Sequence, residues 1–263
     1  ALALALETKE MNDFGRVVAL CRKATVCATS LADDQAGGRK ARTSMIISAA
    51  VNLAIAVSGL GDKDRARILF QAAGVRARQI GDTNNLIRCL ANLAEEAGDE
   101  ADWQLCLEYV DQWVALAKEL RDDGEEADAL RKRGAALFEL RKYDDAKSSL
   151  ERALILARDN FARDEAQKNL NLVQSEIEEM RCARELLREL VTQCNAAANT
   201  GESIAEARLR LSAGEAAFRL HQDDEAVLHL ERYFALLDDY GCGVAATGVD
   251  NLRHCTAVAN MAE

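Results

Sequence analysis

Apolar residues recur three and four positions apart along most of the chain, in paired stretches separated by short polar segments. This spacing predicts amphipathic helices, because residues three and four apart share one face of a helix. The best-defined pair lies within 130–153, and the polar residues 141–144 separate its two stretches. The pattern therefore predicts helical hairpins.

The hairpin pattern repeats every forty residues. In the central unit its positions are Leu130, Gly134, Leu137, Tyr143, Ala146, Leu150 and Ala153. Similar residues stand forty and eighty residues upstream and eighty residues downstream. A weaker unit takes the fourth place, with Leu170, Ile177, Leu186 and Leu190. Because one hairpin cannot bury its apolar face alone, the units are expected to stack.

These positions resemble the tetratricopeptide repeat (TPR) family over residues 47–237. The usual TPR unit has about 34 residues. The forty-residue unit of this chain is more similar to the long units of LGN and the kinesin light chains. The resemblance implies an all-α fold: a right-handed α-solenoid of stacked antiparallel helix pairs (a TPR superhelix) with about five to six repeats.

The repeat predicts how the chain is organised. A TPR array is expected over 47–240, with units starting near 47, 87, 127, 167 and 207. Residues 1–31 are expected to form an N-terminal helix or a partial first repeat, and 32–46 a loop and linker. A C-terminal capping helix is expected over 241–263. The chain begins without methionine, so we also expect it to be a segment of something longer.

The fourth unit has no turn signal. Residues 164–198 contain no glycine, and residues 178–181 stand where the turn is expected. Two interpretations remain open: a tight turn without glycine, or one long helix. We favour the turn, because the forty-residue register resumes correctly after it.

Composition supports a folded, helical chain. Its 263 residues are 49% apolar and include no proline, which would break a helix interior. Only 5% are aromatic, which argues against a β-sandwich or barrel. The uncharged apolar stretches fall short of the roughly 18–20 residues of a membrane span, so no membrane contact is expected. A formal net charge of −11 without a basic stripe excludes a typical nucleic-acid binder.

Reactive side chains show no arrangement typical of an active site. The eight cysteines include no C-x-x-C pair and are expected to be reduced thiols packed in helices. The three histidines, His221, His229 and His254, suit neither a metal site nor a Cys–His dyad. No phosphate-binding loop occurs, and acidic pairs fall at turns, where carboxylates cap helices. We therefore expect no enzyme activity, no cofactor and no metal site.

Surface recognition is the remaining candidate function. The TPR proteins of the LGN and kinesin-light-chain kind carry an Asn-Leu-Gly motif whose amide holds the backbone of a bound peptide. The matching segments here are Asn52-Leu53-Ala54 and Asn92-Leu93-Ala94, and an amide offers both the donor and the acceptor that a peptide unit requires. The alternative is that each Asn only bonds a neighbouring helix. The later units depart from the motif, with Lys132, Leu172 and Ser212 at this position.

The first helices of the units are expected to line a concave groove. Its predicted partner-binding residues are Asn52, Arg88, Asn92, Arg131, Lys132, Phe138, Arg208 and Phe218. Basic groups gather toward the middle of this set, which favours an acidic or amphipathic segment of a protein partner.

Two functions remain open. The first is a non-enzymatic adaptor that binds an extended or helical partner segment along the groove. The second is a structural scaffold subunit of a large assembly, for example axonemal or dynein-associated, docked through its convex face or its ends. The reduced thiols predict a reducing, cytoplasmic location. The resemblance implies a link to the cytoskeleton, motors or cilia.

Overall fold

The computed structural model describes residues 19, 21, 23, 26 and 36–239. Within residues 36–239 the fold is all-α, with nine helices and no strand. The prediction of an all-α helical repeat is therefore confirmed. The chain divides into two compact units, residues 1–173 and 174–263, and each is described by itself. The predicted capping helix at 241–263, and nearly all of the predicted N-terminal helix at 1–31, lie outside the described residues.

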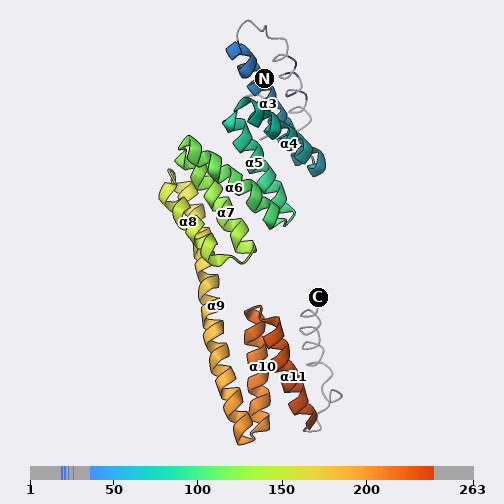
Figure 1. Cartoon of the computed structure of the whole chain (residues 1–263), viewed down its shortest axis with the longest axis vertical. Coiled ribbons are helices and arrows are strands. Elements are labelled where there is room, and N and C mark those ends of the chain that lie inside the picture. Colours follow the sequence, from blue (N-terminus) through green and yellow to red (C-terminus); the bar gives the residue numbers. More distant parts are fainter. Residues whose placement is uncertain (1–18, 20, 22, 24–25, 27–35, 240–263) are drawn as a thin grey trace. The chain divides into compact units, whose positions relative to one another are not determined.

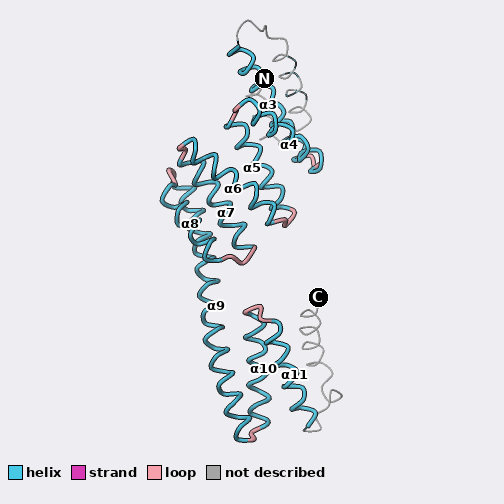
Figure 2. Tube along the Cα trace, viewed as in Figure 1, coloured by secondary structure: helices cyan, strands magenta, loops and turns pink. Residues whose placement is uncertain are grey.

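Successive helices of the first unit pack side by side and are joined by short turns (Figures 1 and 2). They are α3 (Ala36–Gly59), α4 (Lys63–Ile80), α5 (Thr83–Asp99), α6 (Trp103–Leu120), α7 (Asp123–Glu139) and α8 (Tyr143–Leu156). The first helices α5 and α7 begin at residues 83 and 123, forty residues apart as the repeat predicts.

Aspartate side chains fix where four of these helices begin. Asp62, Asp82, Asp102 and Asp122 stand at the N-caps of α4, α5, α6 and α7, and each accepts a backbone N–H from the first turn. Such a carboxylate satisfies an otherwise unpaired donor and complements the helix dipole. One cap every twenty residues gives all of these helices nearly the same length.

One apolar core runs through the first unit from α3 to the start of α9 (Asn160–Thr200). Phe70, Val110 and Leu150 are the large side chains of the second helices, and all three are fully buried. They occupy one position in three successive units, which shows that the stacking follows the sequence repeat. Trp113 links α6 to α7, because its indole N–H donates a hydrogen bond to the Glu125 carboxylate at 3.0 Å.

Helix α3 corrects two expectations. It begins at Ala36, so the predicted loop and linker at 32–46 is wrong from residue 36 onward. Its segment Gly38–Gly59 is also long and apolar enough to cross a membrane, so the apolar stretches are longer than expected. Val51 and Ala54 of this segment are buried in the core shared with α4 and α5, and a core helix passes the same test.

Within the described residues, the second unit comprises α9 from residue 174 onward, α10 (Ser203–Arg219) and α11 (Asp223–Asp239). Helices α10 and α11 pack side by side (Figure 1). Its core joins Leu187, Leu190 and Cys194 of α9 to Ala213 and Ala217 of α10. Helix α10 begins at residue 203, eighty residues after α7, so the register continues.

The fourth unit has no turn. Helix α9 runs through residues 178–181 without a break over 41 residues, so the favoured turn is wrong and the long helix is correct. The close-approach positions explain this. Forty residues after Gly134 stands Gln174, and forty after Ala146 stands Leu186, and both are exposed. Two large side chains replace two small ones, so the halves of α9 lack the surfaces that let a hairpin close.

Candidate functional site

The predicted groove residues lie on first helices but are divided between the two units. Asn52 lies on α3, Arg88 and Asn92 on α5, and Arg131, Lys132 and Phe138 on α7, all within the first unit. Arg208 and Phe218 lie on α10 in the second unit, where both are exposed.

Arg88 is the centre of a polar cluster between α3 and α5. Its guanidinium donates hydrogen bonds to Ser48 Oγ at 3.1 Å, Asn85 Oδ1 at 3.2 Å and Asn52 Oδ1 at 2.7 Å. Asn52 and Asn85 are buried, at 5% and 7% exposure. All three acceptors are uncharged. We call Ser48, Asn52, Asn85 and Arg88 the Arg88 cluster.

The two motif asparagines are used differently. Asn52 gives its side-chain oxygen to Arg88 on the neighbouring helix. Asn92 donates its side-chain N–H to the Arg88 carbonyl of its own helix at 2.7 Å. These are the contacts that a purely structural role requires. The Asn92 side-chain oxygen makes no hydrogen bond within residues 36–239.

Asp82 is the carboxylate that borders the Arg88 cluster, and other groups satisfy it. It accepts hydrogen bonds from the Ser44 hydroxyl at 2.5 Å and from Asn85 Nδ2 at 2.7 Å. Burial alone would raise the pKa of Asp82, but these hydrogen bonds and the charge of Lys40 hold it below its ordinary value. Arg88 itself makes no ion pair with any described residue. Its half-buried charge is therefore not neutralised within the described residues.

Helix α7 adds two further cations to this series of first helices. The Lys132 side chain extends toward α5. Its Nζ lies near Gly98, 3.7 Å from the position that a Cβ atom would take on that glycine. Arg131 interacts electrostatically with Asp128 of its own helix. Neither cation makes an ion pair within the described part of the chain. Phe138 is half-buried and packs edge-on against Tyr143, with 5.7 Å between ring centroids, so it contributes mainly to its own hairpin.

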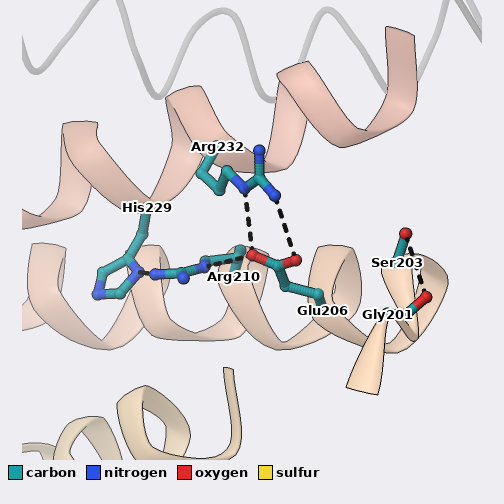
Figure 3. A network of polar contacts seen from close by, with 6 residues as sticks. All are labelled: Gly201, Ser203, Glu206, Arg210, His229 and Arg232. Atoms are coloured by element: carbon teal, nitrogen blue, oxygen red, sulfur yellow. Dashed lines mark hydrogen bonds and ion pairs between the residues drawn. The ribbon is translucent and has the colours of Figure 1, made fainter. Parts of the chain in front are cut away.

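The second unit contains a buried ionic network that the sequence analysis missed (Figure 3). Glu206 is 3% exposed and accepts from Arg232 Nε at 3.1 Å and from Arg210 Nε at 3.4 Å. Arg210 also contacts His229 Nδ1 at 3.2 Å. Burial would raise the pKa of Glu206, but the two arginines lower it, whereas burial and Arg210 lower the pKa of His229. The network joins α10 to α11 and is structural.

A comparison of equivalent positions in the repeat units could have predicted this network from the sequence. Glu126 and Arg152 stand eighty residues before Glu206 and Arg232, and they form an ion pair at 3.5 Å. The same two positions therefore carry the same charges in the third and fifth units.

Among residues 36–239 no group of three or more His, Cys, Asp or Glu side chains could hold a metal ion. The buried thiols of the first unit are protonated at neutral pH, and burial raises the pKa of Cys89 to about 11. Such thiols behave as small apolar side chains.

No family model matches the chain, and no curated protein matches it. A solved structure does: the crystal structure of BtubC (BKLC) from P. vanneervenii, with a TM-score of 0.53 and 16% sequence identity. The superposition covers 87% of this chain and 92% of that chain. At this identity the likeness shows the fold alone, a TPR-like helical repeat.

Proposed function

We propose that the chain is a non-enzymatic protein-interaction scaffold, whose first-helix surface in residues 36–173 binds an acidic or amphipathic segment of a protein partner. A helical repeat offers an extended surface for such a segment. The proposal needs no cofactor. It includes a cytoplasmic location, which rests on the reduced thiols, and a link to the cytoskeleton, motors or cilia, which rests on the resemblance to LGN and the kinesin light chains.

The observation that supports the proposal is the Arg88 cluster. Three neutral oxygens hold the guanidinium at 2.7–3.2 Å, and no described carboxylate neutralises it. A side chain held in this way loses little conformational entropy when it meets a carboxylate. Arg131 and Lys132 on the next first helix extend the positive surface, so an acidic segment would meet two helices in succession.

A second candidate role is docking through the second helices, as in a scaffold subunit. A cleft of about 360 Å³ lies between α4 and α6, above Leu86 and Leu90 of α5. Val75 at its edge is 60% exposed. This cleft is mostly apolar, so it fits an apolar side chain of a neighbouring subunit.

A differential pull-down tests which surface is used. The bait is the full chain, beside an Arg131→Glu/Lys132→Glu variant and a control, Arg76→Glu/Lys118→Glu, with the same charge change on α4 and α6. Circular dichroism checks that all three are folded. We expect the main partner, identified by mass spectrometry, to be lost only with the Arg131→Glu/Lys132→Glu variant. If the control loses it equally, or neither does, the first-helix surface is not the binding site.

A further inference from the structure

A hollow of about 800 Å³ lies between the second half of α9 and α10, within the second unit. Its apolar lining consists of Met180, Ala183, Leu186, Leu190 and Ala216. Leu186 is 47% exposed, so part of this apolar lining faces solvent. We call this hollow the α9–α10 slot.

The repeat explains why the α9–α10 slot is open. Leu190 stands forty residues after Leu150 and forty before Leu230, and those two leucines lie against Gly134 and Gly214 of the first helix in their own hairpin. Because α9 continues without a turn, no first helix of its own hairpin covers Leu186, whereas Leu190 is buried in the core with α10. The slot is therefore the place where the repeat would put one more helix.

Acidic side chains border the slot. Glu176 and Glu179 of α9 and Glu215 of α10 line it, with Arg219 as its only lining cation among the described residues. None of these four makes an ion pair within residues 36–239. The neighbouring Arg181 is used elsewhere, because it pairs with Glu178 and Glu185. The slot thus combines an apolar floor with an unneutralised negative border.

We propose that the α9–α10 slot binds an amphipathic helix of a protein partner that carries Lys or Arg on both sides of an apolar stripe. The border supplies the charge complementarity, and the floor receives the stripe. From Glu176 to Leu190 the slot extends about 21 Å at about 1.5 Å per residue, which fits about four turns of helix. Met180 adapts its shape to different apolar side chains. This second surface differs from the first-helix surface in its unit and in its charge.

A display library tests the proposal on the full chain. The probe is a phage library of amphipathic helices with a fixed Leu/Ala stripe and with Lys, Glu or Ser varied at the flanking positions. We expect selection on the wild-type chain to enrich Lys at those positions, and the binding of the selected peptide to weaken with added salt. If selection enriches no Lys, the proposal is wrong.

Charge-reversal variants test whether the selected peptide binds in the slot. Glu179→Lys/Glu215→Lys reverses two exposed border residues, and Glu189→Lys/Glu231→Lys makes the same charge change on exposed positions outside the slot. We expect the first variant to lose the selected peptide at least tenfold and to enrich Glu when it is panned, while the control binds normally. Equal loss in both variants would mean that net charge alone attracts the peptide, which overturns the proposal.

Cys182 gives an independent readout, because its exposed thiol lines the slot. The bound peptide should slow alkylation of Cys182, measured by mass spectrometry, and unchanged alkylation would overturn the assignment. Light scattering distinguishes a second copy of the chain as the occupant. If the chain is a dimer and Leu186→Asp converts it to a monomer, a second copy of the chain occupies the slot. That result would overturn the proposed partner helix. The proposed function is tested at Arg131 and Lys132 of the first unit, so it can fail without affecting this result.

Discussion

Gly134 and Leu150 touch so closely that a Cβ atom added to Gly134 would lie 2.5 Å from Leu150 Cγ. Leu150 is fully buried. The contact recurs eighty residues later, where the Cβ position of Gly214 lies 2.9 Å from Leu230 Cγ. In the preceding unit, Ala94 and Val110 hold the same two positions. A larger residue on one helix is thus matched by a smaller one on the other.

The first prediction follows from this contact. Gly134→Ala should lower the free energy of unfolding of the first unit by about 1–3 kcal/mol, because a fully packed core cannot accept the extra methyl group. Gly38→Ala is the matched control, since nothing lies within 4 Å of its Cβ position and alanine favours a helix. Urea unfolding followed by circular dichroism measures both variants.

A double variant separates crowding from other effects. Gly134→Ala/Leu150→Val reproduces the Ala94 and Val110 combination of the preceding unit and should recover much of the lost stability. A double variant that is no more stable than Gly134→Ala would contradict the matched-volume explanation.

The second prediction concerns turns without glycine. Ala101, Arg141 and His221 have φ of 59°, 58° and 55°, a region that costs an L-residue roughly 1–2 kcal/mol. Ala101→Gly should therefore raise the free energy of unfolding by about 0.5–1 kcal/mol, even though glycine adds chain entropy. Ala115→Gly, at an exposed position inside α6, should lower it by a similar amount. A destabilised Ala101→Gly variant would refute the strain assigned to this turn.

The third prediction compares the two related ionic sites. Glu206→Gln removes the buried carboxylate that accepts from Arg210 and Arg232 and should cost about 1–3 kcal/mol. Glu126→Gln disturbs a single pair at 3.5 Å to the exposed Arg152 and should cost less than about 1 kcal/mol. Hydrogen exchange of the amides in α10 and α11, and in α7 and α8, reports each site separately. Equal costs would argue against the network.

The fourth prediction is a pH dependence from His229. Its pKa is lowered in the folded chain, so below about pH 6.5 the unfolded chain takes up the proton first. Stability of the second unit should fall as the pH decreases from about 7 to 5.5. Glu206 contributes below this window, because its lowered folded pKa acts only once an ordinary glutamate begins to protonate near about pH 4.3. His229→Gln should remove the slope in hydrogen exchange of α10, and an unchanged slope would exclude His229 as its source.

The fold was largely predictable, because the forty-residue repeat follows directly from the pairs of helices. The small and large positions of the hairpins give the helix pairs, and the caps at Asp62, Asp82, Asp102 and Asp122 give their spacing. The fourth unit was misjudged because the forty-residue register, which resumes after it, was taken as evidence for a turn. Four of the observed turns place Ala101, Arg121, Arg141 and His221 at positive φ, so the absence of glycine alone does not distinguish a turn from a continuous helix. The informative residues were Gln174 and Leu186, which remove the close-approach surfaces.

The candidate site was less predictable, because side-chain partners depend on rotamers and burial. Position alone places Asn52 and Asn92 on first helices. It does not show that Asn52 is committed to Arg88, or that Asn92 bonds its own helix. The α9–α10 slot exists only because a turn is missing, so a method that looks for repeats passes over it.

The pairing of neighbouring helices also determines how the chain can fold during synthesis. Each helix from α3 to α7 contacts the next one along the chain, so it finds its partner soon after both leave the ribosome. Helix α9 is different, because Leu187 and Leu190 form a core with α10, which is translated later. While that helix is still being made, the apolar face of α9 has no cover within its own unit. We expect this interval to be the stage of biogenesis at which the nascent chain most needs a chaperone.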